Sequence, residues 1–106
     1  MDRALNRSDI WLAQVGRKTR PVLVLTRPEV IDVRSLVCVA EVTTTIRGHA
    51  AEVALDSENA GLNRPSVVNC DGLHTIALSS LTRFVSSVDE ETMSRVCASI
   101  NYALNC

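Results

Sequence analysis

Thr19-Arg20-Pro21-Val22-Leu23-Val24-Leu25-Thr26 is the stretch that decides the fold. The apolar run at residues 21–26 is nearly unbroken, which is typical of a strand buried on both faces. A second run, at residues 36–42, predicts another strand and is followed at once by Thr43-Thr44-Thr45-Ile46-Arg47. A guanidinium can hold two phosphate oxygens, and a hydroxyl can orient a phosphate or a ribose. Each strand therefore adjoins residue types suited to phosphate chemistry.

Short strands and loops account for most of the remaining chain. Further strands are predicted at residues 10–13, 51–55, 66–69 and 73–77. Residues 16–20 are predicted to form a short polar loop, Gly and Pro mark a loop at residues 59–65, and residues 78–81 predict a short helical turn. Residues 28–35 are of mixed character and separate the two apolar runs.

The C-terminal segment predicts the clearest helix. Its apolar residues recur at the i, i+3, i+4, i+7 spacing of one buried face: Met93, Val96, Cys97, Ile100 and Leu104. Ser87 and Glu90 fit a capping box, and Asp89 is an alternative N-cap. Several short strands followed by one helix predict a mainly β protein: a small, strongly curved sheet or barrel with the C-terminal helix packed on it.

Length and composition predict a single domain over residues 1–106. Hydrophobic residues make up 46%, enough for a core and too many for a disordered chain. No apolar run approaches the ~20 residues of a membrane span, and the charged first ten residues do not resemble a signal peptide. We therefore expect a cytoplasmic protein without membrane contact.

Charge is unevenly distributed although the net charge is only -1. Residues 1–47 hold eight Lys or Arg against five Asp or Glu, and residues 48–106 hold three against seven. Ten of the eleven basic residues are Arg, whose fork of donors suits phosphate oxygens. Charge alone is equally compatible with phosphate binding and with an ordinary solvated surface.

The cysteines and histidines predict neither a metal site nor a cofactor. The four cysteines form no C-x-x-C pair, and no His, Cys, Asp and Glu spacing suits a metal. Cys38 and Cys97 are predicted to be core thiols, and no structural disulfide is expected in the cytoplasm. His49 is expected to be an exposed turn residue, and His74 a surface or substrate-facing residue rather than a catalyst.

Asp9-Ile10-Trp11, Arg64-Pro65-Ser66-Val67-Val68-Asn69-Cys70-Asp71 and Leu81-Thr82-Arg83 complete an ordered set with the two stretches above. Over roughly residues 8–105 this set resembles the MazF/PemK family of toxin endoribonucleases. The resemblance implies an SH3-like, CcdB-like barrel and a homodimer that is blocked by a cognate antitoxin. It also implies metal-independent, sequence-specific cleavage of single-stranded RNA, leaving 2′,3′-cyclic phosphate and 5′-hydroxyl ends.

The resemblance assigns the chemistry to Arg20 and Thr43. A guanidinium does not release its proton at neutral pH, so we expect Arg20 to stabilise charge on the phosphorane rather than act as the base. Thr43 is expected to orient the phosphate or the 2′-hydroxyl. Asp71 is the candidate proton acceptor, and a turn carboxylate before Gly72 is an equally good interpretation of it. The residues expected to contact RNA are Arg17, Lys18, Thr44, Thr45, Arg47 and Asn69.

Three departures from the family pattern leave other interpretations open. The loop before Arg20 is short, Gly72 and His74 stand where Gln and Arg are usual, and Asn69 replaces the Arg of one branch's Arg-Cys-Asp segment. Thr44 and Thr45 also suit a strand without any RNA contact. The alternatives to a nuclease are a CcdB-like poison that binds a protein, and a degenerate binding module that has lost cleavage.

Overall fold

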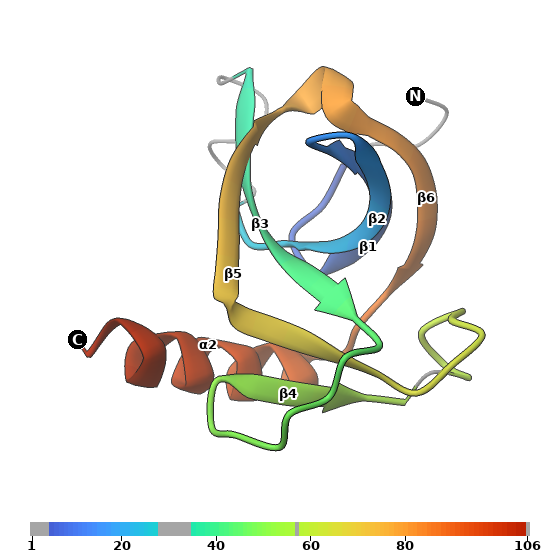
Figure 1. Cartoon of the computed structure of the whole chain (residues 1–106). Coiled ribbons are helices and arrows are strands. Elements are labelled where there is room, and N and C mark those ends of the chain that lie inside the picture. Colours follow the sequence, from blue (N-terminus) through green and yellow to red (C-terminus); the bar gives the residue numbers. More distant parts are fainter. Residues whose placement is uncertain (1–4, 28–34, 57, 106) are drawn as a thin grey trace.

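Six antiparallel strands form one curved sheet in the part of the chain that the computed structural model describes, which is residues 5–27, 35–56 and 58–105. Across the sheet the strands run in the order β4-β5-β3-β2-β1-β6 (Figure 1). The bounds are β1 (Asp9–Val15), β2 (Lys18–Val24), β3 (Leu36–Thr43), β4 (Glu52–Leu55), β5 (Ser66–Ala77) and β6 (Leu81–Ser87). A 3-10 turn, η1 (Leu78–Ser80), joins the last two strands, and the helix α2 (Glu90–Leu104) follows.

The sheet curves strongly but is not closed, because β4 and β6 remain its two edges. The predicted fold class, mainly β with a C-terminal helix, is confirmed, and the barrel is an open one. In Figure 1, α2 lies behind β4 and below the corner of β5, the two strands that it contacts most. The segment predicted to separate the two apolar runs lies almost entirely outside the described residues.

Val22, Leu23 and Val24 of β2 are completely buried, and they supply both faces of the sheet. Leu23 joins a cluster beneath α2, whereas Val22 and Val24 join a second cluster around Trp11 on the opposite face. Burial on both faces explains why this strand is an unbroken apolar run. The predicted polar loop at residues 16–20 is shorter than expected, since Gly16 and Arg17 make the turn and β2 already begins at Lys18. Gly16 has φ of 63°, a left-handed conformation that glycine adopts readily.

β5 is one bent strand rather than the two strands predicted at residues 66–69 and 73–77. Its register with β3 jumps from Glu41 opposite Asn69 to Ala40 opposite Leu73, so residues 70–72 have no partners on β3. Figure 1 shows β5 turning a sharp corner in its middle, where this bulge lies. Bulges of this kind bend a strand and increase its twist. Asp71 therefore lies within a bulged strand, and not in a turn between two strands.

α2 begins after Asp89, the alternative N-cap of the prediction, which accepts a hydrogen bond from the Thr92 backbone N–H at 2.8 Å. The predicted capping box of Ser87 and Glu90 was wrong, because Ser87 ends β6 and its hydroxyl donates to the Asp9 carboxylate. Met93 and Val96 are buried as predicted. Cys97 and Leu104 are exposed, so their assignment to the core was wrong. The buried face is instead completed by Ser99, whose hydroxyl donates to the Ala50 carbonyl.

Two further predictions need correction. Cys38 is half-buried rather than a full core thiol. β6 is absent from the predicted strands, because its sequence Leu-Thr-Arg-Phe-Val-Ser-Ser lacks a clear alternation of apolar and polar residues. The 3-10 turn at η1 does fall within the helical turn predicted at residues 78–81.

Candidate functional site

Arg20 and Thr43 occupy matching positions on neighbouring strands. β2 and β3 pair through Val22 opposite Glu41 and Leu23 opposite Ala40. The same register, continued beyond the last paired residues, places Pro21 opposite Val42 and Arg20 opposite Thr43. The recorded pairing ends before these two positions, near Pro21, which has no N–H to donate. The two residues that the sequence singled out are therefore brought together where the strands separate.

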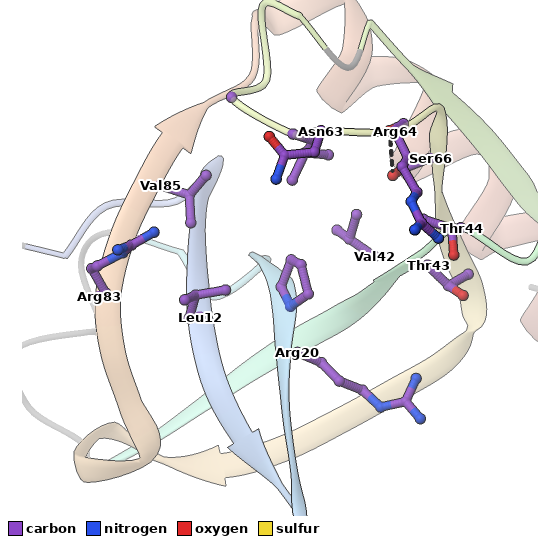
Figure 2. A pocket seen from close by; sticks show the side chains of 13 residues that line it. Leu12, Arg20, Val42, Thr43, Thr44, Asn63, Arg64, Ser66, Arg83 and Val85 are labelled. Atoms are coloured by element: carbon purple, nitrogen blue, oxygen red, sulfur yellow. Dashed lines mark hydrogen bonds between the residues drawn. The ribbon is translucent and has the colours of Figure 1, made fainter.

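This separation leaves a hollow of about 440 Å³ on the surface (Figure 2). Its walls come from β1, β2, β3, β6 and the loop before β5. The lining residues are Leu12, Arg20, Pro21, Val42, Thr43, Thr44, Gly61, Leu62, Asn63, Arg64, Ser66, Arg83 and Val85. The floor is mainly apolar and the rim is polar, which is a usual composition for a ligand-binding site.

Three arginines approach the hollow from different elements. Figure 2 shows Arg20 on β2, Arg83 on β6 and Arg64 on the loop that precedes β5. Arg64 and Arg83 are exposed, and the Arg20 side chain is 38% exposed. Arginines from three elements thus line one hollow, and in Figure 2 the Arg20 guanidinium points away from the other two, with the Glu41 carboxylate 3.7 Å from it. A surface lined by arginines attracts phosphate groups.

The Thr43 hydroxyl has a local partner and a hydrogen still to donate. Its Oγ1 accepts a hydrogen bond from the Thr45 backbone N–H at 3.1 Å. A hydroxyl can accept one bond and donate another. Thr43 can therefore order the segment after β3 and also donate to a phosphate oxygen in the hollow. Thr44 lines the same hollow, whereas Thr45 and Arg47 are exposed and are not among its lining residues.

Glu52 organises the segment that contains Arg47. Its carboxylate accepts hydrogen bonds from the backbone N–H groups of Arg47 at 3.0 Å and Gly48 at 2.8 Å, and the His49 Nε2 lies 3.8 Å away. Desolvation acts to raise the pKa of Glu52, but these N–H donors and His49 together lower it below its ordinary value. His49 is exposed, as predicted.

Asp71 and Asn69 lie apart from this hollow. Asp71 is exposed and lines a different hollow beside the end of α2, together with His49 and Tyr102. The Asn69 Oδ1 accepts from the Asp71 backbone N–H at 3.1 Å, which helps to hold the bulge. Arg17 and Lys18 are exposed at the tip of the β1–β2 hairpin, outside the lining of the hollow. The structure therefore joins Arg20 with Thr43 and Thr44, but not with Asp71.

Cys70, between Asn69 and Asp71, belongs to the core. Its side chain is 1% exposed and lies in the cluster beneath α2. Desolvation raises the pKa of its thiol, so the nucleophilic thiolate is disfavoured. The described residues include no group of three or more His, Cys, Asp and Glu side chains placed to hold a metal ion. No helix in the described part of the chain is long and apolar enough to cross a membrane.

Sequence reasoning gave no role to several residues of the site. Arg64, Ser66 and Arg83 stood inside quoted motifs, but a motif does not reveal which hollow its side chains line. Asn63, which lines the hollow, and Glu41, whose Oε1 lies 3.7 Å from the Arg20 Nη1, were not considered at all. The signal that could have found Glu41 is a charged residue inside an apolar strand, since a half-buried charge needs a partner.

Comparison with known proteins gives a consistent result. Residues 6–104 match the family described as PemK-like, MazF-like toxin of type II toxin–antitoxin system. The chain is 51% identical over 74 residues to Endoribonuclease MazF3 of Mycobacterium tuberculosis, with 70% of each protein covered. The solved structure of Mycobacterium tuberculosis toxin MazF-mt6 superposes with a TM-score of 0.86 at 40% identity, covering 92% of this chain and 96% of that one. An endoribonuclease in complex with its cognate antitoxin, from Mycobacterial species, shares the fold with a TM-score of 0.86 at 22% identity and 96% coverage of both chains.

Proposed function

Because this chain belongs to the PemK-like, MazF-like toxins of type II toxin–antitoxin systems, we propose that it is an endoribonuclease that cuts single-stranded RNA. The observation that carries the proposal is that Arg20 and Thr43, from two neighbouring strands, line the same hollow, which Arg64 and Arg83 also line. Three arginines suit the charged backbone of RNA, and the apolar floor suits the flat faces of unpaired bases.

The chemistry follows from the residues at the hollow. The ribose 2′-hydroxyl attacks the adjacent phosphate, and negative charge grows on the phosphorane oxygens. The Arg20 guanidinium stabilises that charge, because preorganised donors are most effective where charge develops in the transition state. Thr43 donates its free hydrogen to a phosphate oxygen and orients the phosphate for attack. The products are a 2′,3′-cyclic phosphate and a 5′-hydroxyl end, and no metal takes part.

The remaining predicted contacts extend the RNA path beyond the hollow. Arg17 and Lys18 stand at the hairpin tip on the same strand pair as Arg20, and Arg47 lies in the segment that follows Thr45. Contacts of this kind are made to the RNA backbone and fix its register without reading sequence. Asn69 and Asp71 lie on the bulge and are not assigned to the reacting phosphate.

The functional unit is proposed to be a homodimer of single-domain chains spanning residues 1–106. A cognate antitoxin protein is proposed to bind this chain, as one binds the solved relative, and to block its RNA-binding surface. The protein is proposed to act in the cytoplasm, where its RNA substrate is found.

The proposal is tested by incubating the purified protein with single-stranded RNA of random sequence in excess EDTA. We expect cuts at a restricted set of sequences, with 5′ ends that accept a phosphate directly from polynucleotide kinase and 3′ ends that need cyclic-phosphate removal before ligation. A protein that bound RNA without cutting it would support the degenerate binding module. A protein with neither activity would support a poison that acts on a protein target.

A further inference from the structure

Glu41 places a carboxylate directly against Arg20. It lies on β3, two residues before Thr43, and its side chain is 21% exposed. Its Oε1 is 3.7 Å from the Arg20 Nη1, and its Oε2 is 3.2 Å from the Nε2 of His74 on β5. Among the described residues, these are the two charged or titratable side chains within ion-pair distance of Glu41. The carboxylate thus stands between the proposed phosphate-binding guanidinium and an imidazole.

The surroundings of Glu41 leave room for its carboxylate. Gly72, in the β5 bulge, has no side chain, and a Cβ built there would lie 2.8 Å from the Glu41 Oε2 and 3.0 Å from the Asn69 Nδ2. The His74 Nε2 is buried and makes no hydrogen bond in this arrangement despite its closeness to Glu41. The bulge therefore creates a space in which the carboxylate fits and a titratable nitrogen faces it.

The proposed cleavage needs a group that takes the proton from the 2′-hydroxyl. Arg20 keeps its proton at neutral pH, and the Thr43 hydroxyl is a weak base. Asp71 lines a different hollow. A base must come within hydrogen-bond reach of the proton that it removes. Glu41 does not line the hollow itself, but its carboxylate lies 3.7 Å from the Arg20 guanidinium that would hold the reacting phosphate.

We propose that Glu41 is the general base of this site, and that His74 is a residue that positions its carboxylate. This inference rests on the proposed nuclease function. Glu41 accepts the proton of the 2′-hydroxyl as the bond between O2′ and phosphorus forms. The bond from phosphorus to the 5′ oxygen breaks, and that oxygen takes a proton from water. Glu41 then returns its proton to the solvent, so the cyclic phosphate and the 5′-hydroxyl are the only products.

The test compares single-turnover cleavage by the unmodified protein, Glu41→Gln, Arg20→Ala and Glu91→Gln. Glutamine keeps the size of the Glu41 side chain and removes its basicity. We therefore expect the cleavage rate of Glu41→Gln to fall about 100-fold or more, which is the usual contribution of a general base. Glu91 is exposed in the first turn of α2 and serves as the matched control, with an unchanged rate. An RNA with a 2′-deoxy nucleotide at the cut site should bind Glu41→Gln at least as tightly as the unmodified protein, because one negative charge near the phosphate is gone.

The pH profile separates a base from a merely structural residue. The unmodified protein should speed up with pH and then level off once the Glu41 carboxylate is ionised. Glu41→Gln should remain slow and rise in proportion to hydroxide, which then removes the proton. His74→Gln keeps a side-chain donor near the Glu41 carboxylate, so it should retain more of the cleavage rate than His74→Ala at a similar melting temperature.

Gly72→Ala gives an independent perturbation. Its new Cβ must displace the ends of the Glu41 and Asn69 side chains, which can move at little cost in stability. We expect slower cleavage with a nearly unchanged melting temperature.

A folded Glu41→Gln variant that cleaves at the normal rate, while Arg20→Ala does not, would overturn the role of Glu41 but leave the proposed nuclease function intact. A large loss of cleavage rate in Asp71→Asn, with no loss in Glu41→Gln, would also overturn the role of Glu41 as the general base. Failure of the unmodified protein to cut any RNA would reject the nuclease, and the role of Glu41 with it.

Discussion

β2 and β3 form a paired ladder at one end and separate at the other, and the two ends carry different kinds of residue. Where they pair, Val22, Leu23 and Val24 are buried on both faces of the sheet. Where they separate, Arg20 and Thr43 face an open hollow. The paired end sets the register, and the register places the two polar side chains opposite each other. Substitutions at the open end should therefore change activity, and those at the paired end should change stability.

The largest effect on activity is expected from Arg20→Ala. Loss of one preorganised donor to the transition state should slow cleavage about 100- to 1,000-fold. The melting temperature should hardly change, because the side chain is 38% exposed and its ion pair with Glu41 is long. Single-turnover rates and thermal unfolding measure the two quantities. Arg95→Ala, on the exposed face of α2, is the matched control. A large fall in melting temperature would show that the open end supports the fold after all.

Leu23→Ala tests the paired end. Leu23 is completely buried, so its truncation should lower the free energy of unfolding by about 3 kcal/mol, within the usual range for buried leucines. Urea unfolding measures this change, and Leu36→Ala, at a position that is 41% exposed, should cost far less. The fraction of Leu23→Ala that remains folded should keep its cleavage rate. An inactive but fully folded protein would mean that the two ends are not separable.

Thr43→Val sharpens the comparison at a single hydroxyl. Valine keeps the branched shape that suits a strand and has no donor for a charged phosphate, so we expect cleavage to slow about 10- to 100-fold. The melting temperature should fall only slightly, since the missing acceptor for the Thr45 N–H is at the surface. Thr75→Val, at an exposed position of β5 that does not line the hollow, is the control. Equal cleavage rates for Thr43→Val and the unmodified protein would show that Thr43 serves only the structure of the strand.

The hairpin tip allows a weaker test of the same open end. Replacing Arg17 and Lys18 with Ala should weaken binding to all RNAs similarly, and should flatten the salt dependence by roughly 0.7 log units for each phosphate that is no longer bound. The sequences cut should stay the same, because interactions with the RNA backbone carry little sequence information. Cleaved ends from a random RNA pool provide the comparison. A changed set of sites would show that the tip reads bases.

The smallest effect concerns pH and the segment after β3. Its backbone donors lower the pKa of Glu52 below the ordinary 4.5. A carboxylate with a lowered pKa stabilises the fold above the unfolded value, and this contribution disappears as pH falls through the lower, folded value. The stability of unmodified protein and Glu52→Gln should therefore differ at neutral pH and converge in acid. Chemical unfolding at a series of pH values measures this, and a constant difference across the acid range would contradict it.

Much of the fold could be predicted from local sequence patterns, because each pattern reflects one feature of the surroundings of its residues, such as burial on both faces of a sheet or the start of a helix. The double burial of β2 is visible as an unbroken run, and the start of α2 is visible at Asp89. Exposure of Cys97 was missed because helical spacing shows that a face is apolar but not how far the sheet extends beneath it. The bulge in β5 was mistaken for a break because Asp71 and Gly72 are typical turn residues.

The site was only partly predictable for a similar reason. Arg20 and Thr43 adjoin recognisable strands, so their resemblance to family motifs was informative. Their relation to Arg64, Arg83 and Glu41 depends on long-range strand order, which brings together residues far apart in sequence. Gly72 and His74 looked like isolated departures from the family pattern. The fold shows that both lie against Glu41, which sequence reasoning had passed over.

The hydrogen bonds that Glu52 and Thr43 make to the segment after β3 have a consequence for the entropy of binding. Fixing the backbone of one residue costs about 1–2 kcal/mol of conformational entropy. The backbone N–H groups of Thr45, Arg47 and Gly48 are already held in the free protein, so much of that cost falls on folding. A flexible RNA strand must itself lose freedom when it binds. Because the protein surface is already ordered, a few interactions along a short length of RNA are enough to hold the strand.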